Sequence, residues 1–407
     1  MKIFFSVGEP SGDLHGANLI RTLRERRPEI ECIGYGGPRM AAAGCKLEFD
    51  LTELAIMWFF RVLLNIHKFF GLLWRADRIF RTERPDAVVL IDYPGFNFWI
   101  ARRAKAHGIP VIYYGGPQVW AWACWRVNRI RRLIDHLLCK LPFEVPWYED
   151  RNCQATYVGH PYFDELASRK LDEEFLAAQR AVPGRLVTIL PGSRTQEVTA
   201  NLPYFLRAAA VVARECPEAR FAIASFNAKQ AEIARELAAG AGVPLEIHVG
   251  RTPELIEAAE CAMACSGSVS LELLYHVKPT VIYYQVSHAA YFVQGFFNKS
   301  RYITLANLLM HDELPPQGEE PFDPDAEGAE QVAMPEYLTA VDRSADMANW
   351  ILRWLRDPAA RRAQLEMLAE VRARTVHSGA SIRAAEYILG VLEPGESLQP
   401  QPLKQAG

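Results

Sequence analysis

The eight cysteines of this 407-residue chain include no Cys-x-x-Cys pair. Several of them lie inside apolar, strand-like runs, such as Cys139 in HLLCKLP and Cys261 in CAMAC. Buried thiols of this kind are typical of proteins in a reducing compartment. We therefore expect free cysteines, with neither disulfides nor a zinc site.

The chain also lacks the apolar segments that mark export or membrane insertion. A strand-like run, IFFSVG, follows Lys2 directly and ends in a Gly-rich turn, whereas a signal peptide needs a longer apolar core and a small-residue cleavage site. No uncharged apolar run reaches the roughly 18 residues that a membrane-spanning helix requires. The sequence therefore predicts neither a signal peptide nor a transmembrane helix.

Charge is distributed unevenly along the chain, although the net charge is only −3. Residues 1–166 contain 22 Lys and Arg against 18 Asp and Glu, a net charge of +4, so the remaining residues carry −7. The basic excess coincides with the aromatic-rich half, which indicates an anionic surface or ligand there and no nucleic acid.

Strand-like runs alternate with helical patterns twice along the chain, which is long enough for two to three domains. This repetition predicts an α/β fold of two doubly wound, Rossmann-like domains that face one another across a cleft. We expect domains at 1–166 and 167–340, C-terminal helices at 341–393 and a disordered tail at 394–407.

The stretch DAVVLIDYPGFN, residues 86–97, places an acid at the end of an apolar strand. Ala87 to Ile91 forms the expected strand, and Asp92 follows it into a Pro/Gly turn. Open α/β sheets bind their ligands at the carboxyl ends of the strands, so Asp92 is a candidate catalytic base. Alternatively, Asp92 only caps the next helix or closes the turn.

The first expected strand leads into GEPSGDLHG, residues 8–16. Its glycines let backbone N–H groups approach a ligand, and the following helix N-terminus favours anionic groups. Glu9 and Asp13 suit sugar hydroxyls better than a phosphate. The alternative is that the glycines serve only packing between strand and helix.

Two turns of the second half have the composition of a nucleotide site. SGS at 266–268 opens a helix whose N–H groups and hydroxyls can hold a diphosphate, and Glu272 can accept hydrogen bonds from a ribose. PGSR at 191–194 places Arg194 where it can bind phosphate and neutralise a leaving group. An N-cap serine and a surface arginine are the alternative interpretations.

Residues 54–76 form an apolar, aromatic helical pattern with one narrow cationic face. Such a helix is suited to lie in a membrane interface, although a buried helix or a dimer contact is also compatible with the pattern. The Trp/Arg-rich segment 119–135 is a second candidate for a membrane contact or, alternatively, a solvated helix face.

The motifs GEPSGD, GGPRM, IDYPGFN, VWAW, LPFE, VGHP, LPGSR, SGSVSLE and NLL, in this order, resemble the lipid-A-disaccharide synthase family. The resemblance extends from residue 3 to about 315. It implies a glycosyltransferase fold of the B type and an inverting transfer from UDP-diacylglucosamine to diacylglucosamine-1-phosphate, with release of UDP. It also implies a peripheral enzyme on the cytoplasmic face of the inner membrane, and several members dimerise through a swapped C-terminal region.

Matching the motifs by position implies roles for individual residues. The catalytic acid falls on Asp92 and the phosphate-binding arginine on Arg194. The substrate site implied by the matched motifs comprises Glu9, Ser11, Gly12, Asp13, Gly192, Ser193, Arg194, Ser266, Gly267, Ser268, Glu272 and Asn307. Pro10, Gly95, Gly116, Gln118 and Ala306 depart from the usual family residues. No metal or other cofactor is expected.

Three other functions remain open from the sequence. A UDP-sugar epimerase, or a glycosyltransferase of the same fold with another lipid acceptor, would share the same two-domain pattern. A nicotinamide- or flavin-dependent oxidoreductase is disfavoured because no G-x-G-x-x-G follows the first strand. A non-catalytic membrane-docking module would not need Asp92 and Arg194 at strand ends.

Overall fold

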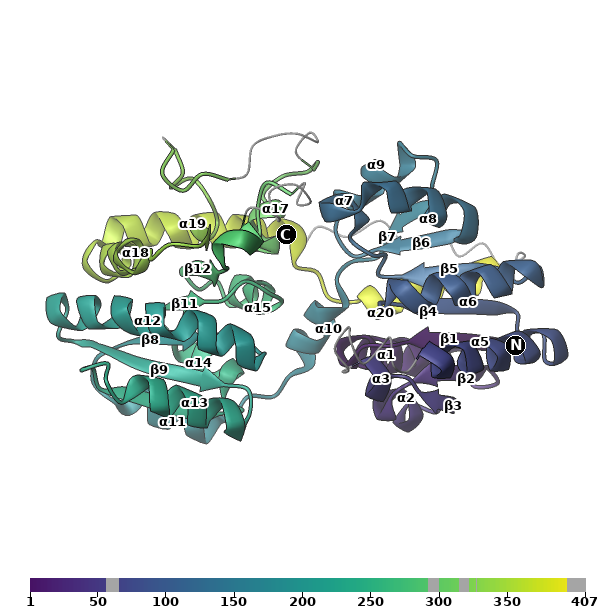
Figure 1. Ribbon diagram of the computed structural model, residues 1–407, viewed down its shortest axis with the longest axis horizontal. Coiled ribbons are helices and arrows are strands. Elements are labelled where there is room, and N and C mark those ends of the chain that lie inside the picture. Colours follow the sequence, from purple (N-terminus) through teal and green to yellow (C-terminus); the bar gives the residue numbers. More distant parts are fainter. Residues whose placement is uncertain (56–65, 292–299, 315–321, 327, 394–407) are drawn as a thin grey trace. The chain divides into compact units, whose positions relative to one another are not determined.

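The computed structural model describes residues 1–55, 66–291, 300–314, 322–326 and 328–393 (Figure 1). The chain divides into two compact units, each described here by itself. The first unit contains Met1–Ala167 and the chain from His377 onward, and the second contains Ser168–Val376.

The first unit is built on a parallel sheet of seven strands in the order β3-β2-β1-β4-β5-β6-β7. The strands are β1 Lys2–Val7, β2 Glu31–Gly36, β3 Lys46–Asp50, β4 Ala87–Ile91, β5 Val111–Tyr114, β6 His136–Cys139 and β7 Ala155–Tyr157. β4 has the sequence AVVLI and is buried throughout, as expected for a central strand with both faces covered. Val7 of β1 pairs with Ile91 of β4, so these two strands end at the same level.

Helices connect and cover this sheet (Figure 1). They are α1 Pro10–Arg26, α2 Pro38–Ala42, α3 Thr52–Ala55, α5 Ile66–Thr82, α6 Pro94–Ala106, α7 Val119–Trp122, the 3₁₀ helix η1 Cys124–Arg126, α8 Val127–Leu133, α9 Glu144–Glu149, α10 Pro161–Ser168 and α20 Ala380–Leu392. Of the apolar helix predicted at 54–76, residues 56–65 lie outside the described residues. The predicted tail 394–407 lies outside them as well.

The last helix, α20, packs against α1 of the first unit. Its Ala384, Ile388 and Leu389 join the same buried cluster as Ile3 and Phe5 of β1. The Asp164 carboxylate caps α20 by accepting the backbone N–H groups of residues 379–381, at 2.5 to 3.1 Å. The final helix therefore completes the N-terminal sheet, although more than 200 residues separate them along the chain.

The second unit has a parallel sheet of six strands in the order β10-β9-β8-β11-β12-β13. The strands are β8 Arg185–Leu190, β9 Ala219–Ser225, β10 Leu245–Val249, β11 Cys261–Ala264, β12 Thr280–Gln285 and β13 Glu336–Thr339. Its helices are α11 Glu173–Ala181, α12 Thr195–Glu215, α13 Ala228–Ala238, α14 Thr252–Ala258, α15 Val269–Tyr275, α17 Leu305–Leu308, α18 Ser344–Arg356 and α19 Pro358–Thr375. α12 and α18 pack on this sheet around Phe205, Ile351 and Trp354.

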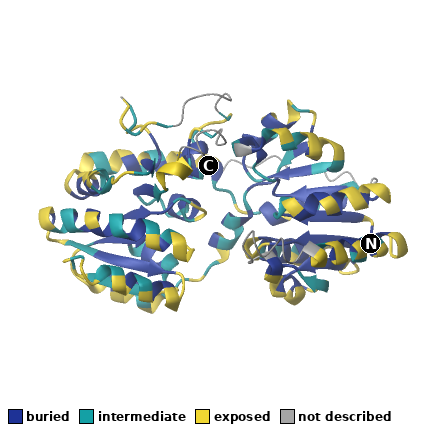
Figure 2. Ribbon diagram, in the orientation of Figure 1, coloured by how far each residue is buried: buried dark blue, intermediate teal, exposed yellow. Residues whose placement is uncertain are grey.

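In both units the strands are mostly buried, and the helices expose their outer faces (Figure 2). The prediction of an α/β fold with two parallel, helix-covered sheets and C-terminal helices is confirmed. All eight cysteines are free thiols, and all except Cys124 are buried. No helix in the described ranges is long and apolar enough to cross a membrane.

Candidate active site

Asp92 leaves the buried strand β4 in a conformation that is unusual for a residue with a side chain. Its φ is +50°, and the φ of Tyr93 is +43°. The left-handed region costs roughly 1–2 kcal/mol for a non-glycine residue. The carbonyl oxygen of Asp92 accepts hydrogen bonds from the Tyr113 hydroxyl, at 2.5 Å, and from the Asn97 side-chain amide, at 2.7 Å. The fold therefore holds Asp92 in a strained turn, as is common at active sites.

Asn97 is the fully buried residue that organises this turn. Its Nδ2 lies 3.1 Å from the carbonyl oxygens of both Ser6 and Ile91, at the ends of β1 and β4. Its Oδ1 accepts the Ser6 hydroxyl at 2.6 Å. Sequence reasoning assigned Asn97 only to a turn. The sequence feature that could have identified Asn97 is an amide side chain within an otherwise apolar helical segment.

The Asp92 carboxylate lies against groups from two other strand ends. The Lys140 Nζ, just after β6, lies 3.6 Å from Asp92 Oδ1. On the other side, a Cβ added to Gly12 would lie 2.8 Å from Asp92 Oδ2, so only a glycine leaves room for the carboxylate there. The Asp92 and Lys140 side chains are 17% and 15% exposed, which leaves both partly accessible to a ligand.

Two histidines lie near this pair, the buried His15 and the half-buried His160. Burial lowers the pKa of His15 to about 4, so its imidazole is neutral at pH 7. Burial, followed by the nearby Lys140 and His15, holds the pKa of His160 well below its usual range. His160 Nδ1 accepts the backbone N–H of Tyr162, and His15 Nδ1 has no hydrogen-bond partner within the described ranges. A neutral His15 therefore lies near both Asp92 and Lys140, and a neutral His160 lies near Lys140.

The GEPSGD turn contributes to the site in two different ways. Glu9 and Ser11 are exposed at its start, whereas Gly12 is buried against Asp92. Asp13 is also buried, and its carboxylate accepts the N–H groups of residues 37, 39 and 40 at 2.9 to 3.0 Å. Asp13 therefore caps α2, and direct contact between Asp13 and a sugar stays a prediction.

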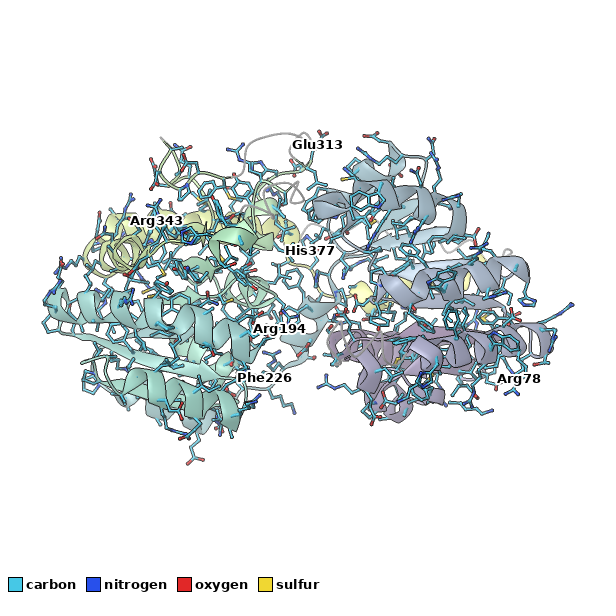
Figure 3. All side chains as sticks on the ribbon, viewed as in Figure 1. Arg78, Arg194, Phe226, Glu313, Arg343 and His377 are labelled. Atoms are coloured by element: carbon cyan, nitrogen blue, oxygen red, sulfur yellow. The ribbon has the colours of Figure 1, made fainter. Side chains whose placement is uncertain are left out.

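In the second unit, the PGSR turn follows β8. Ser193 and Arg194 are exposed, and the Arg194 side chain reaches 78% exposure (Figure 3). Glu197 Oε2 accepts the backbone N–H groups of both residues at 3.0 and 3.1 Å, and its Oε1 pairs with Arg194 Nη1 at 2.9 Å. Gly192 has a φ of +127°, and an added Cβ would lie 2.4 Å from Glu197 Cβ. The glycine therefore lets Glu197 hold the turn with Arg194 facing solvent.

The SGS turn leaves the neighbouring strand β11. The Cys265 N–H donates to the carbonyl oxygen of Leu190 at the end of β8, so the SGS and PGSR turns start side by side. Gly267 and Ser268 are exposed, whereas the Ser266 hydroxyl donates to the carbonyl oxygen of Ile303 at 2.8 Å. Two predicted phosphate-binding turns therefore meet at one edge of the sheet.

Glu272 and Asn307 are buried beside these turns. Glu272 Oε1 lies 2.5 Å from Nη1 of Arg169. Asn307 Nδ2 donates to the Met334 carbonyl at 2.8 Å and to the Glu336 carboxylate at 2.9 Å. The role of Asn307 in these contacts is to hold the 303–308 turn in place.

Sequence reasoning did not identify Gln230, which links two strand ends of the second unit. Its side chain is buried and donates to the Ser193 carbonyl oxygen at 2.5 Å. Its Oε1 accepts the N–H of Phe226, whose side chain is 68% exposed after β9 (Figure 3). Gln230 therefore fixes the PGSR turn from the side opposite β11. No local pattern distinguishes it from other helix-surface glutamines.

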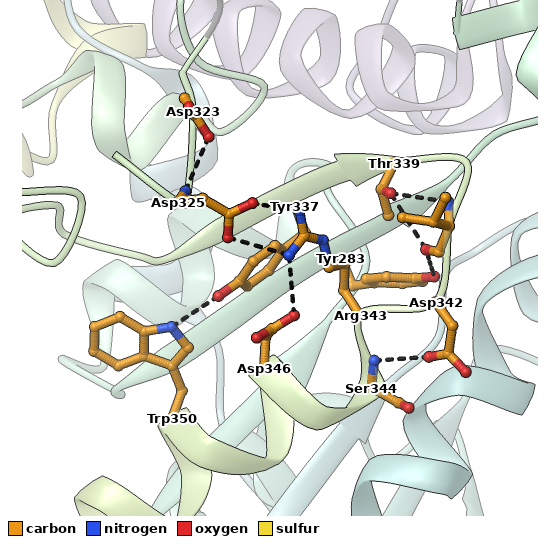
Figure 4. Close-up of polar contacts among 11 residues, drawn as sticks. Tyr283, Asp323, Asp325, Tyr337, Thr339, Asp342, Arg343, Ser344, Asp346 and Trp350 are labelled. Carbon is orange, nitrogen blue, oxygen red and sulfur yellow. Dashed lines mark hydrogen bonds and ion pairs between the residues drawn. The ribbon is translucent and has the colours of Figure 1, made fainter. Parts of the chain in front are cut away.

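An Asp-x-Asp triplet occurs at 323–325, a pattern that in some glycosyltransferases would suggest a metal. Here Asp325 pairs with Arg343 at 2.5 Å, and Asp323 accepts the Asp325 N–H (Figure 4). Arg343 also contacts Asp346, at 3.4 Å. Within the described ranges, no group of three or more His, Cys, Asp or Glu side chains is placed to hold a metal ion.

Solved structures share this fold at low sequence identity. The UDP-N-acetylglucosamine 2-epimerase of Neisseria meningitidis, solved with UDP-GlcNAc, matches with a TM-score of 0.61 at 13% identity, over 96% of this chain and 100% of that chain. The calicheamicin glycosyltransferase CalG4 matches with a TM-score of 0.57 at 15% identity, over 96% and 98% of the two chains. At these identities the likeness shows the fold alone.

Comparisons of the sequence identify the family as well as the fold. The model of the lipid-A-disaccharide synthetase family matches residues 3–349. The lipid-A-disaccharide synthase of Myxococcus xanthus is 34% identical over 397 residues, 97% of this chain and 98% of that protein. The corresponding protein of Trichlorobacter lovleyi is 31% identical over 393 residues, 96% of this chain and 98% of that protein. The chain therefore belongs to the lipid-A-disaccharide synthase family and is a glycosyltransferase of lipid A biosynthesis.

Proposed function

We propose that this glycosyltransferase joins UDP-diacylglucosamine to diacylglucosamine-1-phosphate, with inversion at the transferred sugar carbon. The observation that carries the proposal is Asp92, a strained and partly accessible carboxylate at the carboxyl end of β4 in a member of this family. Capping or turn closure alone would not need a carboxylate beside Lys140 and Gly12, because the turn is held through the Asp92 carbonyl oxygen.

Asp92 acts as the general base. The primary hydroxyl of the acceptor gives its proton to the Asp92 carboxylate while its oxygen forms a bond to the anomeric carbon. The bond from that carbon to the diphosphate breaks at the same time, and its electron pair leaves with UDP. General base catalysis of this kind contributes about 10²–10⁴-fold to the rate.

The turns of the second unit bind the UDP part of the donor. Arg194, beside Gly192 and Ser193, neutralises the diphosphate as it leaves. Residues 266–268 contribute backbone and hydroxyl donors, and Glu272 accepts hydrogen bonds from the ribose. We assign Asn307 to the same site, where it supports the 303–308 turn through Met334 and Glu336.

The acceptor side is assigned to the first unit. Glu9 and Ser11 are exposed at the start of α1 and are placed to bind sugar hydroxyls, whereas Gly12 and Asp13 shape the turn. We propose an acceptor domain of residues 1–166 and a nucleotide-sugar domain of residues 167–340.

A face of the first unit supports membrane binding. Four large aromatic residues are 54–77% exposed on three of its helices: Phe70 and Trp74 on α5, Trp99 on α6 and Trp125 on η1. α6 packs against both α5 and α8. Exposed arginines accompany the rings, at positions 78, 81, 102, 103, 129, 131 and 132. We call these aromatic and basic residues the aromatic–basic face.

Aromatic rings with arginines suit the interface of an anionic bilayer, where rings enter the headgroup region and cations meet phosphates. We propose that the aromatic–basic face holds the enzyme peripherally on the cytoplasmic face of the inner membrane, where its acylated substrates lie. Phe69 of the same helix packs on Tyr93 and Phe96 and serves the core. A homodimer is part of the proposal, as the family resemblance implies.

The decisive experiment compares Asp92→Asn with the exposed control Asp150→Asn. UDP release is followed with purified protein, UDP-diacylglucosamine and the lipid acceptor, and donor binding is measured by calorimetry. We expect Asp92→Asn to lose turnover by at least 10² while donor binding stays within about twofold, because the amide keeps the shape but cannot accept the proton. Retained turnover with lost binding would refute the role of Asp92.

The same assay separates the epimerase alternative. An epimerase converts a single labelled UDP-sugar without any lipid acceptor, whereas the proposed transferase releases UDP only when the acceptor is present. Formation of an epimeric UDP-sugar in the absence of acceptor would replace the proposed reaction.

A further inference from the structure

The geometry points to Lys140 as a positioning residue that holds Asp92 ionised and fixes the orientation of its carboxylate. This inference rests on the proposed role of Asp92 as base and names a second residue of that site. Lys140 Nζ lies 3.6 Å from Asp92 Oδ1, and both side chains are largely shielded from solvent.

The contact between Lys140 and Asp92 passes across strand β5. Lys140 follows β6 and Asp92 follows β4, and β5 lies between them in the sheet. The Lys140 and Asp92 side chains together therefore span two strand spacings, roughly 10 Å. Gly115, with φ +71°, stands at the end of β5, and an added Cβ would lie 2.9 Å from Lys140 Cδ and 3.3 Å from Lys140 Nζ. The glycine leaves the passage through which the lysine reaches Asp92.

Hydrogen bonds to Glu144 hold the backbone at Lys140 in place. The N–H groups of Lys140 and Leu141 both donate to Glu144 Oε2 at 3.0 Å, and the Trp120 indole donates to Glu144 Oε1 at 3.0 Å. Glu144 is fully buried. Since the main chain makes these contacts, a substitution of the Lys140 side chain leaves them in place, and the loss of the ammonium can be studied on an intact scaffold.

Three described ionisable groups, His15, Tyr113 and Tyr114, interact electrostatically with Asp92, and none of the three is positively charged at pH 7. His15 is neutral at pH 7 because burial lowers its pKa to about 4. The buried hydroxyls of Tyr113 and Tyr114 also act electrostatically on Asp92, and burial raises the pKa of each. The nearby carboxylates of Glu9, Asp164 and Glu165 are negatively charged like Asp92. Each of them raises the pKa of at least one of these three groups, as Asp92 does. Of the groups named here, Lys140 brings the opposite charge to the Asp92 carboxylate, at 3.6 Å.

The orientation of the carboxylate follows from the same contacts. Lys140 lies on the Oδ1 side of Asp92, and Gly12 lies on the Oδ2 side. An ion pair at Oδ1 limits rotation of the carboxylate in the strained turn. A base that is ionised and fixed before the acceptor binds reacts without reorganisation.

The test is the pH dependence of kcat/KM between pH 5 and 9 for Lys140→Met, Lys140→Gln and Lys140→Arg. Lys46→Met, at an exposed lysine of the edge strand β3, is the matched control. We expect the acid limb to move to higher pH by about one unit in the Met and Gln variants, because an opposite charge within 4–6 Å has effects of this size. A move of one unit costs at most tenfold, at pH values below the wild-type limb, and the loss becomes smaller as the pH rises.

Lys140→Arg should restore most of the wild-type profile, and Lys46→Met should match wild type throughout. A loss that is equal at every pH, or an unshifted acid limb, would overturn the inference. So would a higher KM for the acceptor with unchanged kcat and an unshifted limb, because Lys140 would then contact the acceptor phosphate. Thermal melts identify a variant that fails to fold, and the uncharged polar Gln variant covers a failure of the Met variant.

Failure of this inference is distinguishable from failure of the proposed function. If Asp92→Asn abolishes turnover but the Lys140 variants keep the wild-type acid limb, only the role of Lys140 is wrong. If Asp92→Asn retains turnover, the assignment of the base is wrong, and the role of Lys140 falls with it.

Discussion

The side-chain amide of Asn97 lies 2.7 Å from the carbonyl oxygen of Asp92, and the same amide reaches the ends of β1 and β4. One buried side chain thus couples the strained turn of the candidate base to the two central strands. The Tyr113 hydroxyl reinforces the turn from β5. The position of the carboxylate therefore depends on two buried residues, one from α6 and one from β5.

Asn97→Ala should destabilise the protein and impair catalysis together. Truncation removes the acceptor of the Ser6 hydroxyl and one donor to each of three carbonyl oxygens, at a cost of about 1–3 kcal/mol in the free energy of unfolding. We expect kcat to fall as well, because the Asp92 turn loses its support. Urea unfolding and the UDP-release assay check this, with the half-exposed Asn18→Ala on α1 as control. Unchanged stability in Asn97→Ala would show that Tyr113 alone holds the turn.

Arg194→Ala should weaken UDP binding by about tenfold or more without changing stability. Its side chain is 78% exposed, so its ion pair with Glu197 contributes little to folding. The Arg194 guanidinium is expected to contribute to UDP binding through a charge-assisted hydrogen bond to phosphate, which Arg194→Lys should restore only in part. Calorimetry with UDP measures the effect, and Arg214→Ala, at the other end of α12, is the control. Equal UDP affinity in the two variants would place Arg194 outside the nucleotide site.

Glu336 predicts a pH-dependent stability. Burial raises the pKa of this carboxyl to about 7 from its usual 4.5, against the hydrogen bonds donated by Ile303 and Thr304. Between these two values the folded protein keeps a proton that the unfolded chain has released. The stability contribution is therefore complete below pH 4.5 and is lost as the pH rises through 7.

Unfolding free energies of wild type and Glu336→Gln, measured from pH 4 to 8, test this sign. The difference between them isolates Glu336, because other titrating groups such as His15 are common to both proteins. We expect wild type to lose stability relative to the variant between pH 4.5 and 7 and then to level off. Parallel curves over the whole range would show that Glu336 titrates in the fold as it does in the unfolded chain.

Membrane binding should depend on the aromatic–basic face. The double variant Phe70→Ser and Trp74→Ser should shift the protein from the vesicle pellet to the supernatant, because both rings are exposed and contribute little to the core. Flotation with vesicles that contain anionic lipid measures the partition. Ile382→Ser, an exposed apolar position on α20, is the control. Equal partition of variant and control would exclude this face as the docking surface.

Local patterns were sufficient for the architecture. The alternation of apolar strands with helices is a short-range property, and it predicted both parallel sheets and the position of Asp92 at a strand end. Arg194 and the SGS turn were found in the same way, since each follows an apolar run directly. That these two turns start side by side depends on the pairing of β8 with β11, which no local pattern contains.

By itself, the sequence determined the strands, the turns that follow them and the family, because these depend on neighbouring residues and their order. The folded structure adds four contacts that no local pattern contains: Lys140 reaches Asp92 across β5, Asn97 supports the Asp92 turn, Asp13 caps α2, and α20 completes the first unit. Each of these contacts joins residues from different elements. Strand order and packing bring such residues together, so these contacts cannot be predicted from the order of neighbouring residues.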